Sequence, residues 1–567
     1  MCCEKMRPLW LFSFLLSFAA YLPVCGEPFP CLNPSIQSGR LRSVDMKGDG
    51  WSIAVSSIFQ RHLDRWIYGH GLIENRCWPS HPELSSADPE MARFCDFDFD
   101  TVWSEWDVSR NPDPYANPPS AGKCGDHFGT SPAHRHGYLF GQVFRKEYGE
   151  IISENCTGNG EGGGEVSLES DGAQKNEQTL MHEFRGLCGG RLPELGEFPR
   201  EKVIVSDWSP SAPLTPFFLK RDLCRNGTRD EMGKEEGDAK RKSELWGEAA
   251  ELSKRIAEIT GHSPVPPEDK SGEYLDNVFD CTVVHQCHGL SDVPPPFLTD
   301  EGATLWEGAD TAETSWRLFS FDFWREREGG RRLVEYGSQA YGYFFYVLLD
   351  RFVAALQGES SERLFIQVMS DSDMTALLGL LDRQRGARRP PWGSALVWEL
   401  WERPSASSSS SPSSSSTETG EGGKGEGGGR NIPMERAVTL SFNGESINPC
   451  PPLHFPSKSD SPSRSVSSSH SQTDSHSGGE GSSEQPSSSS SSSASSLVCS
   501  LEDFARWVSH MIPPREWCPE FYENYRRVSR ASSGDPTAGV LEGFCSSNAG
   551  HLEVPDLSEM ADKPYFK

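Results

Sequence analysis

The chain has 567 residues, and its 54 Lys and Arg against 82 Asp and Glu give a formal net charge of −28 at pH 7. This acidic balance argues against a general nucleic-acid binder, which would carry a basic stripe, and against docking on anionic membranes through a polybasic face. Hydrophobic residues make up only 35% of the chain, so we expect a folded core of several hundred residues interrupted by unfolded segments.

The first 26 residues are typical of a secretory signal. Lys5 and Arg7 precede an uncharged apolar run over residues 10–22, which Pro23 then breaks. The run is shorter than the roughly 20 residues that a membrane span needs. We therefore expect a signal peptide over residues 1–26, with an uncleaved signal anchor as the alternative. The mature chain would have no integral membrane span and would enter the secretory pathway, to be secreted or held in a vesicular, lysosome-like lumen.

The cysteines agree with export. Three of the sixteen lie in the first 26 residues, and the remaining thirteen lack the paired CxxC spacing of a zinc site. We expect no metal or cofactor, and we expect most of these cysteines to form disulfides in an oxidising compartment. Asn155 and Asn226 begin sequons that are candidate glycan acceptors.

The predicted elements alternate along the chain. Short runs rich in β-formers predict strands at residues 51–59, 203–205, 364–369 and 394–400. Helical periodicity predicts helices at residues 136–148, 243–260, 341–356 and 501–512. Strands that alternate with helices indicate an α/β core.

Four segments have compositions that cannot bury enough apolar surface to fold. They are rich in Gly and Glu, in charge, or in Ser, and they cover residues 158–175, 229–242, 405–429 and 457–496. We expect them to be disordered insertions. The serine tracts are interpreted as solvated spacers; the alternative is that they are the working part of the protein and the core is a scaffold.

The most informative motif is Arg61-His62-x-x-Arg65, which follows the first predicted strand directly. Ligands of open α/β sheets sit beyond the carboxyl ends of the strands. Arginine binds phosphate oxygens with two donors at once, and a neutral imidazole can attack phosphorus. The motif therefore predicts a phosphate site with a nucleophilic histidine.

Residues 61–65 resemble the RHGxRxP signature of the histidine acid phosphatase family, branch 2 of the histidine phosphatase superfamily. Further segments follow in the family's order and resemble its other blocks. They are residues 129–148 (a GQLT-type helix), 202–207 (the strand ending in S-T-D-x-x-R-T), 365–380 (S-A-H-D-T-T-L), 390–400 (P-P-Y-A-S), 438–445 (V-x-x-x-Y-N-G) and 499–513 (C-x-L-x-x-F…I-P).

The resemblance implies the histidine phosphatase fold, with a central mixed sheet flanked by helices and a smaller helical cap. The implied organisation is a signal peptide (1–26), a core (45–404) that includes the cap insertion (about 70–200), a disordered insertion (405–430), a strand region (431–456), a second disordered insertion (457–496), a helix region (497–530) and a tail (531–567).

The resemblance also assigns roles at the site. His62 would be the nucleophile, Arg61 and Arg65 would bind the phosphate, and Asp371 would protonate the leaving oxygen. In another register Asp373 takes the place of Asp371.

The chain departs from the family pattern at four positions. Leu63 replaces the glycine of RHG, Ile67 replaces the proline, and Ser370 replaces the histidine before the acid. The third arginine would fall near Pro210 or Ser211, where none is present. Substitutes for that arginine could come from elsewhere in the chain: Arg325, Arg327 or Lys220.

Two histidine-rich strings receive structural interpretations. His134-Arg135-His136-Gly137 contains an RHG string, but it starts a predicted helix and is interpreted as surface. The resemblance places residues 287–290 at a C-H-x-x segment, which implies a disulfide cysteine and a structural histidine at Cys287 and His288 rather than a metal site.

The sequence therefore predicts a secreted or vesicular acid phosphatase-like hydrolase that works through a phosphohistidine at His62, weakened by the lost arginine and histidine. Its expected substrate is a phosphorylated small molecule or a glycan or protein phosphomonoester. The alternative is a catalytically inactive relative that binds a phosphorylated ligand or partner.

Overall fold

A computed structural model provides the fold. It describes residues 31, 33, 38–42, 45–65, 129–153, 156, 165–170, 174–188, 203–205, 250–258, 261, 280–285, 287–288, 331–382, 389–405, 434–451 and 497–511.

The strands in this part of the chain form one eight-stranded mixed sheet in the order β3-β2-β4-β1-β5-β6-β7, with β8 also paired to β6. The first four strands in this order are parallel, and the others run antiparallel to their neighbours. The bounds are β1 Ser52–Arg61, β2 Val166–Ser170, β3 Val203–Val205, β4 Leu364–Met369, β5 Ala395–Pro404, β6 Met434–Phe442, β7 Glu445–Ile447 and β8 Val498–Ser500.

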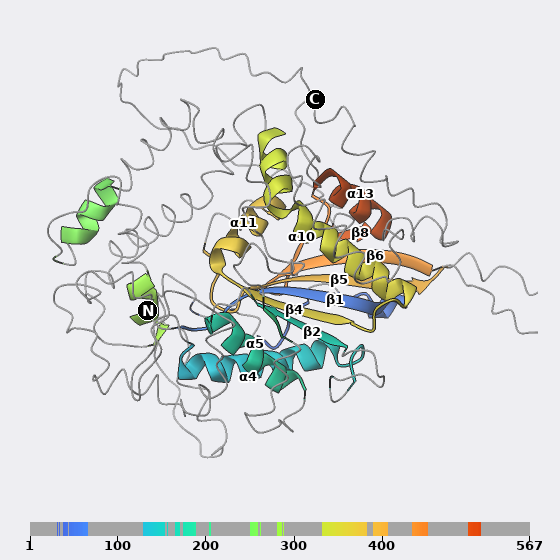
Figure 1. Cartoon of the computed structure of the whole chain (residues 1–567), viewed down its shortest axis with the longest axis horizontal. Helices are drawn as coiled ribbons and strands as arrows, with labels where there is room; N and C mark the ends of the chain where they lie inside the picture. Colours follow the sequence, from blue (N-terminus) through green and yellow to red (C-terminus); the bar gives the residue numbers. More distant parts are fainter. Residues whose placement is uncertain are drawn as a thin grey trace, which may run out of the picture.

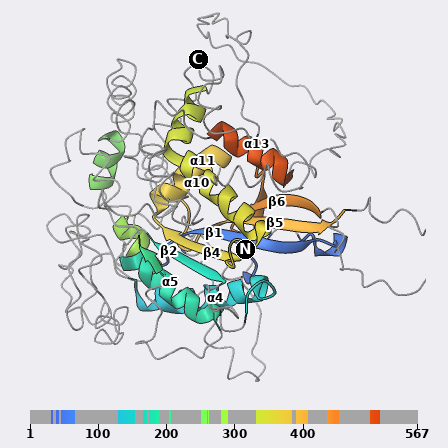
Figure 2. The ribbon, with the colours of Figure 1, turned by 45° about the vertical axis from the view of Figure 1, so that its right-hand side comes forward.

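Helices cover both faces of the sheet (Figures 1 and 2). The helices α4 and α5 lie on one face, and α10, α11 and α13 lie on the other. Their bounds are α4 Ser131–Tyr148, α5 Gln174–Leu187, α10 Arg331–Gln357, α11 Asp371–Leu381 and α13 Leu501–Met511. A mixed sheet between two helical layers confirms the predicted α/β class.

The central strand β1 contributes to both hydrophobic cores. Val55 and Phe59 point to the core under α10, whereas Ile53 and Ile58 belong to the core under α4 and α5. The pairing of β1 with β5 shifts register between Ile53 and Val55. An extra residue at such a bulge reverses the face to which the following side chains point, which puts Ile53 and Val55 in different cores. The neighbours Ile58 and Phe59 then alternate between the two faces, so β1 is apolar on both sides.

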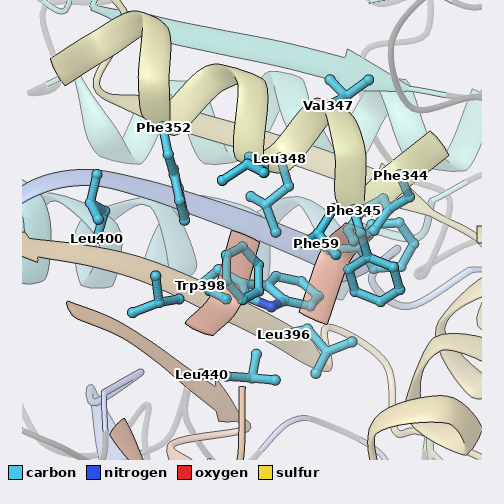
Figure 3. Close-up of a cluster of buried hydrophobic side chains, with 14 of the residues drawn as sticks. Phe59, Phe344, Phe345, Val347, Leu348, Phe352, Leu396, Trp398, Leu400 and Leu440 are labelled. Atoms are coloured by element: carbon cyan, nitrogen blue, oxygen red, sulfur yellow. The ribbon is translucent and has the colours of Figure 1, made fainter. Parts of the chain in front are cut away.

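Aromatic side chains fill the core under α10 (Figure 3). Phe344 stands edge-on to Phe59, with ring centroids 5.4 Å apart, and its ring lies 5.4 Å from that of Trp398. Phe345 makes a T-shaped contact with Trp507 of α13 at 4.7 Å. Each such pair adds about 0.5–1.5 kcal/mol beyond the area that it buries, so α10 and α13 are held on the sheet together.

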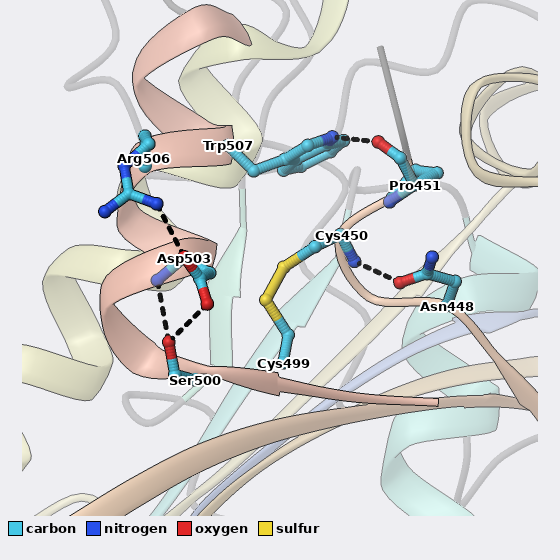
Figure 4. The surroundings of a disulfide bond; sticks show 8 residues. All are labelled: Asn448, Cys450, Pro451, Cys499, Ser500, Asp503, Arg506 and Trp507. Atoms are coloured by element: carbon cyan, nitrogen blue, oxygen red, sulfur yellow. Dashed lines mark hydrogen bonds and ion pairs between the residues drawn. A yellow bond between two sulfur atoms is a disulfide. The ribbon is translucent and has the colours of Figure 1, made fainter. Parts of the chain in front are cut away.

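A serine cap and a disulfide lie directly before the start of α13 (Figure 4). Asp503 donates its backbone N–H to Ser500 Oγ at 3.0 Å, and that hydroxyl donates back to the Asp503 carboxylate. The serine hydroxyl thereby caps the first turn of the helix. The disulfide Cys450–Cys499 links the segment after β7 to β8, so the start of α13 is fixed against the sheet.

Two further disulfides, Cys31–Cys287 and Cys156–Cys188, confirm the expectation of disulfide pairing. Among the helices that the structure describes, none combines the length and the hydropathy needed to span a membrane.

The predicted strands at residues 51–59, 203–205, 364–369 and 394–400 are present as β1, β3, β4 and β5, with small differences at their ends. The predicted helices at 136–148, 341–356 and 501–512 are present as α4, α10 and α13. Residues 250–258 of the helix predicted at 243–260 are also helical.

One sequence interpretation of the region before residue 200 is wrong. Residues 158–175 were expected to be a disordered insertion, but Val166–Ser170 is β2, hydrogen-bonded between β3 and β4. The helical cap predicted within about 70–200 does not include residues 131–148 and 166–187, which form part of the sheet and the helical layer on it. Residues 66–128 and 189–202 lie outside the described residues, so the cap stays a prediction. The signal, both serine-rich insertions and the tail lie outside the described residues.

Candidate functional site

The site lies where two parallel strands end. Arg61 closes β1 in register with Met369 at the end of β4, so the residues that follow the two strands meet at one edge of the sheet. His62 donates its backbone N–H to the Met369 carbonyl at 3.1 Å, and its own carbonyl accepts from the N–H of Gly393 at 3.1 Å. Gly393 has a φ of +70°, a conformation that favours glycine. His62 is thereby fixed between β4 and the turn before β5.

The His62 imidazole is held in one tautomer. It is 1% exposed, and its Nδ1 lies 2.8 Å from the carbonyl oxygen of Leu63. A carbonyl can only accept, so Nδ1 carries the hydrogen. Burial lowers the pKa of His62 well below its ordinary value, and the positive charges of Lys175, Arg61 and Arg65 lower it further. The ring is therefore neutral, and its Nε2 carries a lone pair.

Asp371 lies between two arginines. It opens α11 directly after β4, and its Oδ2 accepts a 2.5 Å hydrogen bond from Nε of Arg389. Nη2 of Arg61 lies 3.4 Å from the same oxygen, while Nη1 of Arg61 donates to the carbonyl of Pro390. The structure thus brings Arg61 and Asp371 together, as the sequence predicts, and adds Arg389.

Arg65 makes a two-pronged ion pair with a carboxylate. Its Nη1 and Nη2 donate to the two oxygens of Asp280 at 3.0 and 2.5 Å. Arg65 is 6% exposed and Asp280 is 7% exposed. This is the bidentate geometry in which a guanidinium also binds phosphate.

Lys175 brings another positive charge to the site from the first turn of α5. It is buried, and its carbonyl accepts a 2.8 Å hydrogen bond from the hydroxyl of Thr179. That hydroxyl accepts the backbone N–H of Leu63 at 3.1 Å. The helix that carries Lys175 is therefore bonded to the residue next to His62.

Leu63 fits although the family pattern has glycine at its position. Among the described non-glycine residues, positive φ occurs only at Cys156 and Asn443, so Leu63 needs no left-handed backbone. A Cβ placed at Gly137 of α4 would lie 3.2 Å from Leu63 Cδ1. The glycine in the helix makes the room that the leucine side chain takes.

The interpretation of His134 and His136 as surface residues is wrong. The His134 ring stacks on that of His182, with centroids 4.0 Å apart, and burial lowers the pKa of His134 to about 4. His136 Nδ1 lies 2.7 Å from a carboxylate oxygen of Asp64. Both histidines pack α4 against its neighbours.

The structural interpretation of residues 287–288 is confirmed. Cys287 forms a disulfide with Cys31, and His288 is 3% exposed. Its Nδ1 lies 2.7 Å from the Val284 carbonyl and its Nε2 lies 3.0 Å from Oγ1 of Thr130. Within the part of the chain that the structure describes, no group of three His, Cys, Asp or Glu side chains is placed to hold a metal.

The sequence did not identify Arg389, Lys175 or Asp280 as site residues. Arg389 directly precedes the Pro390-Pro391 pair of a segment already singled out, so its position in the chain was a usable signal. Lys175 is the last residue of the segment 158–175, which was expected to be disordered. Asp280 lies 215 residues from its partner Arg65 in the sequence. The substitutes considered for the third arginine, Arg325, Arg327 and Lys220, lie outside the described residues, as do Pro210 and Ser211.

A cavity of about 240 Å³ lies at the other end of the sheet, lined by residues that include Ile53, Leu356 and Glu402. It is lined by the start of β1 and the end of β5, whereas His62 follows the end of β1. The cavity therefore has no part in the candidate site.

Comparison with known proteins gave matches among solved structures alone. No family model and no curated protein sequence matches the chain. The multiple inositol polyphosphate phosphatase of Bifidobacterium longum, in its apo form, matches with 11% identity and a TM-score of 0.44, over 76% of this chain and 94% of the other.

Two phytases match similarly. The Hafnia alvei phytase has 12% identity and a TM-score of 0.42, over 83% of this chain and 98% of the phytase. The Citrobacter braakii phytase has 13% identity and a TM-score of 0.41, over 83% and 99%. These structural neighbours are phosphatases.

Proposed function

We propose that the protein is a phosphomonoesterase that works through a phosphohistidine at His62. The supporting observation is the neutral His62 imidazole, whose Nδ1 is tied to the Leu63 carbonyl and whose charge is disfavoured by Lys175, Arg61 and Arg65. A nucleophile with a free lone pair surrounded by cations suits attack on an anionic phosphate ester.

In the first step, Nε2 of His62 attacks phosphorus, forming a P–N bond as the P–O bond to the leaving group breaks. Arg61 and Arg65 stabilise the charge on the phosphoryl oxygens. Asp371 gives its proton to the leaving oxygen, and its position 3.4 Å from Arg61, the phosphate ligand, favours it over Asp373 for this role. In the second step, the Asp371 carboxylate takes a proton from water as the water oxygen attacks phosphorus, the P–N bond breaks, and phosphate leaves.

The lowered pKa of His62 supports work at acid pH. An imidazole with its ordinary value of about 6.5 would be mostly protonated at pH 5 and could not attack. Because burial and nearby cations lower the pKa of His62 well below that value, Nε2 keeps its lone pair in an acidic lumen. The disulfides support passage through the secretory pathway.

The experiment is a covalent-labelling assay. The purified mature protein is incubated with an aryl phosphate carrying labelled phosphorus near pH 5, then quenched. We expect label that survives alkali and is lost in acid, as a phosphoimidazole is, together with release of the phenol. His62→Ala should lose both, whereas His510→Ala, in the last turn of α13, should keep both. Equal turnover by wild type and His62→Ala would contradict the assignment of the nucleophile.

A second candidate function is non-catalytic binding of a phosphorylated ligand. It is favoured by the burial of His62 and by the ion pairs that engage Arg65 and Asp371, because a substrate has to open these contacts to reach the imidazole. Absence of label and turnover over aryl and alkyl phosphates, with phosphate still bound, would select this function over the first.

A further inference from the structure

The ion pair between Arg65 and Asp280 occupies the donors that a phosphate would use. Both terminal nitrogens of the guanidinium meet the two carboxylate oxygens, at 3.0 and 2.5 Å. A carboxylate and a phosphate present similar pairs of oxygens to this fork. One guanidinium edge cannot hold both in this geometry at once.

The segment that carries Asp280 is attached to the site at several points. Residues 280–285 are helical, and Cys287 just after them is bonded to Cys31. His288 lies 3.0 Å from Thr130 Oγ1, and its ring packs on Trp392, whose centroid is 5.9 Å away. Thr130 in turn donates its backbone N–H to the carbonyl of Asp64, next to Arg65. The segment is therefore held beside the site, and the Asp280 carboxylate stays within reach of Arg65.

We propose that Asp280 is an internal competitor of the phosphate for Arg65 and thereby sets the affinity of the site for oxyanions. The proposal rests on the proposed function, because it takes Arg65 as a phosphate ligand. In the resting protein Arg65 is neutralised by Asp280, and a phosphate has to exchange for that carboxylate. The bound anion then gains the fork of Arg65 and releases Asp280.

A purely supporting role for Asp280 makes the opposite prediction. A carboxylate that only holds Arg65 in position for the phosphate would improve binding, as partners of a ligating side chain commonly do. Removing its charge would then weaken oxyanion binding. The sign of the effect of Asp280→Asn therefore separates competition from support.

The experiment measures the binding of inorganic phosphate and of tungstate by calorimetry, at a fixed near-neutral pH where carboxylates are ionised. Asp280→Asn should bind both oxyanions about tenfold more tightly than wild type, the worth of one charge-assisted contact. Asp280→Glu, which keeps the charge, should bind like wild type. Glu435→Gln, a half-exposed partner of Arg403, controls for the change in net charge and should have no effect.

The gain should depend on Arg65. In the double variant Asp280→Asn/Arg65→Gln the tenfold improvement should vanish, which a double-mutant cycle measures directly. Unchanged or weaker oxyanion binding by a folded Asp280→Asn would overturn the proposal, and so would an equal gain in the absence of Arg65.

The wild-type protein supplies a second measurement in case Asp280→Asn does not fold. Saturating phosphate should speed hydrogen exchange of the amides at residues 280–282, because the contact of the Asp280 side chain with Arg65 is lost and the Cys31–Cys287 disulfide holds only the far end of the segment. Slower or unchanged exchange there would contradict the proposal.

These readouts do not depend on turnover. If His62 is phosphorylated but Asp280→Asn gains no affinity, competition fails and the phosphatase stands. If no phosphohistidine forms but Asp280→Asn binds phosphate more tightly, competition stands and catalysis fails.

Discussion

The Oδ2 oxygen of Asp371 faces two guanidinium groups, one from Arg389 at 2.5 Å and one from Arg61 at 3.4 Å. Because both arginines approach the same oxygen, Arg389 balances part of the charge that would otherwise draw Arg61 away from a phosphate. The shorter contact belongs to Arg389, so we assign it the positioning role and leave Arg61 as the phosphate ligand.

Arg389→Gln tests this division of roles. With the closer cation removed, Asp371 should hold Arg61 more tightly, and phosphate should inhibit or bind about tenfold more weakly. The loss should appear in KM and in the phosphate inhibition constant more than in kcat, because Arg61 binds the substrate as well as the transition state. Arg389→Lys keeps the charge and should recover part of the affinity.

The matched control is Arg506→Gln, because this arginine pairs with Asp503 on the exposed face of α13. It should leave phosphate affinity unchanged. If Arg389→Gln lowered thermal stability but left the phosphate inhibition constant at the wild-type value, Arg389 would be a structural residue and not a positioning one.

Local sequence predicted the first half of the site and could not predict the second. Arg61, His62 and Arg65 are neighbours in the chain, so a strand end places them together. Asp280 and Arg389 reach Arg65 and Asp371 from other parts of the chain, and only the folded sheet brings them close. The role of Lys175 depends on α5, whose first two residues belong to the segment 158–175 that was expected to be disordered from its composition.

At the scale of the elements, α4 and α5 approach each other through a pair of glycines. A Cβ at Gly141 would collide with the carbonyl of Glu183, and one at Gly186 would collide with the carbonyl of Tyr138. The two backbones are thus too close for any side chain at either position. This packing sets the place of α5, and with it Lys175 and the Thr179 hydroxyl that binds Leu63.

Gly141→Ala should therefore push the two helices apart. We expect a loss of about 2–3 kcal/mol in the free energy of unfolding, measured with urea, because backbone atoms cannot yield as a flexible side chain can. Oxyanion binding should weaken together with stability, since α5 supports the site.

Gly48→Ala is the matched control, because a Cβ there meets nothing within 4 Å. It should change the free energy of unfolding by less than about 0.5 kcal/mol. Equal stability of the two alanine variants would contradict the close approach of α4 and α5.

The strand β2 illustrates why one element escaped prediction. Its five residues include the buried polar side chains of Ser167, Glu169 and Ser170, and a Gly- and Glu-rich run precedes it. Glu169 is tolerated in the sheet because Arg351 and Gln367 donate to its carboxylate. A parallel strand is normally recognised by a continuous apolar run, and these partners, distant in the chain, remove the need for one.

At the scale of the whole molecule, buried carboxyls and buried histidines have opposite effects on how stability depends on pH. Burial raises the pKa of four carboxyls: Glu183 well above its usual value, Asp350 and Glu399 to about 7, and Glu362 above its usual value. Burial lowers the pKa of four histidines: His62, His134, His182 and His288.

The two kinds of group affect stability in opposite directions. A carboxyl with a raised pKa stabilises the fold below its unfolded value of about 4.5, and that contribution is lost as the pH rises through about 7. A histidine with a lowered pKa stabilises the fold above about 6.5, and that contribution is lost as the pH falls toward its folded value. Between about pH 4.5 and 6.5, the carboxyls lower the free energy of unfolding as the pH rises and the histidines raise it. The two effects oppose each other there, so stability should be greatest between these pH values.

Glu399 offers the sharpest test of the loss of stability expected as the pH rises through about 7. Its carboxyl accepts hydrogen bonds from Tyr148 at 3.0 Å and Thr439 at 3.2 Å, and burial dominates over the nearby Arg42 in raising its pKa to about 7. Arg42 lies 3.6 Å away and pairs more closely with Glu147, at 2.6 Å. The Arg42 guanidinium therefore compensates the Glu399 carboxylate only in part.

Glu399→Gln keeps the shape of the side chain and removes its titration. Between pH 5 and 8 the wild type should lose on the order of 2–3 kcal/mol of unfolding free energy that the variant does not lose, since each unit of pKa shift is worth about 1.4 kcal/mol. Urea unfolding at several pH values measures the difference, and Glu502→Gln, an exposed carboxylate of α13, should follow the wild type throughout. Parallel curves for wild type and Glu399→Gln would mean that Glu399 is ionised in the folded protein, with Arg42 rather than burial governing its charge.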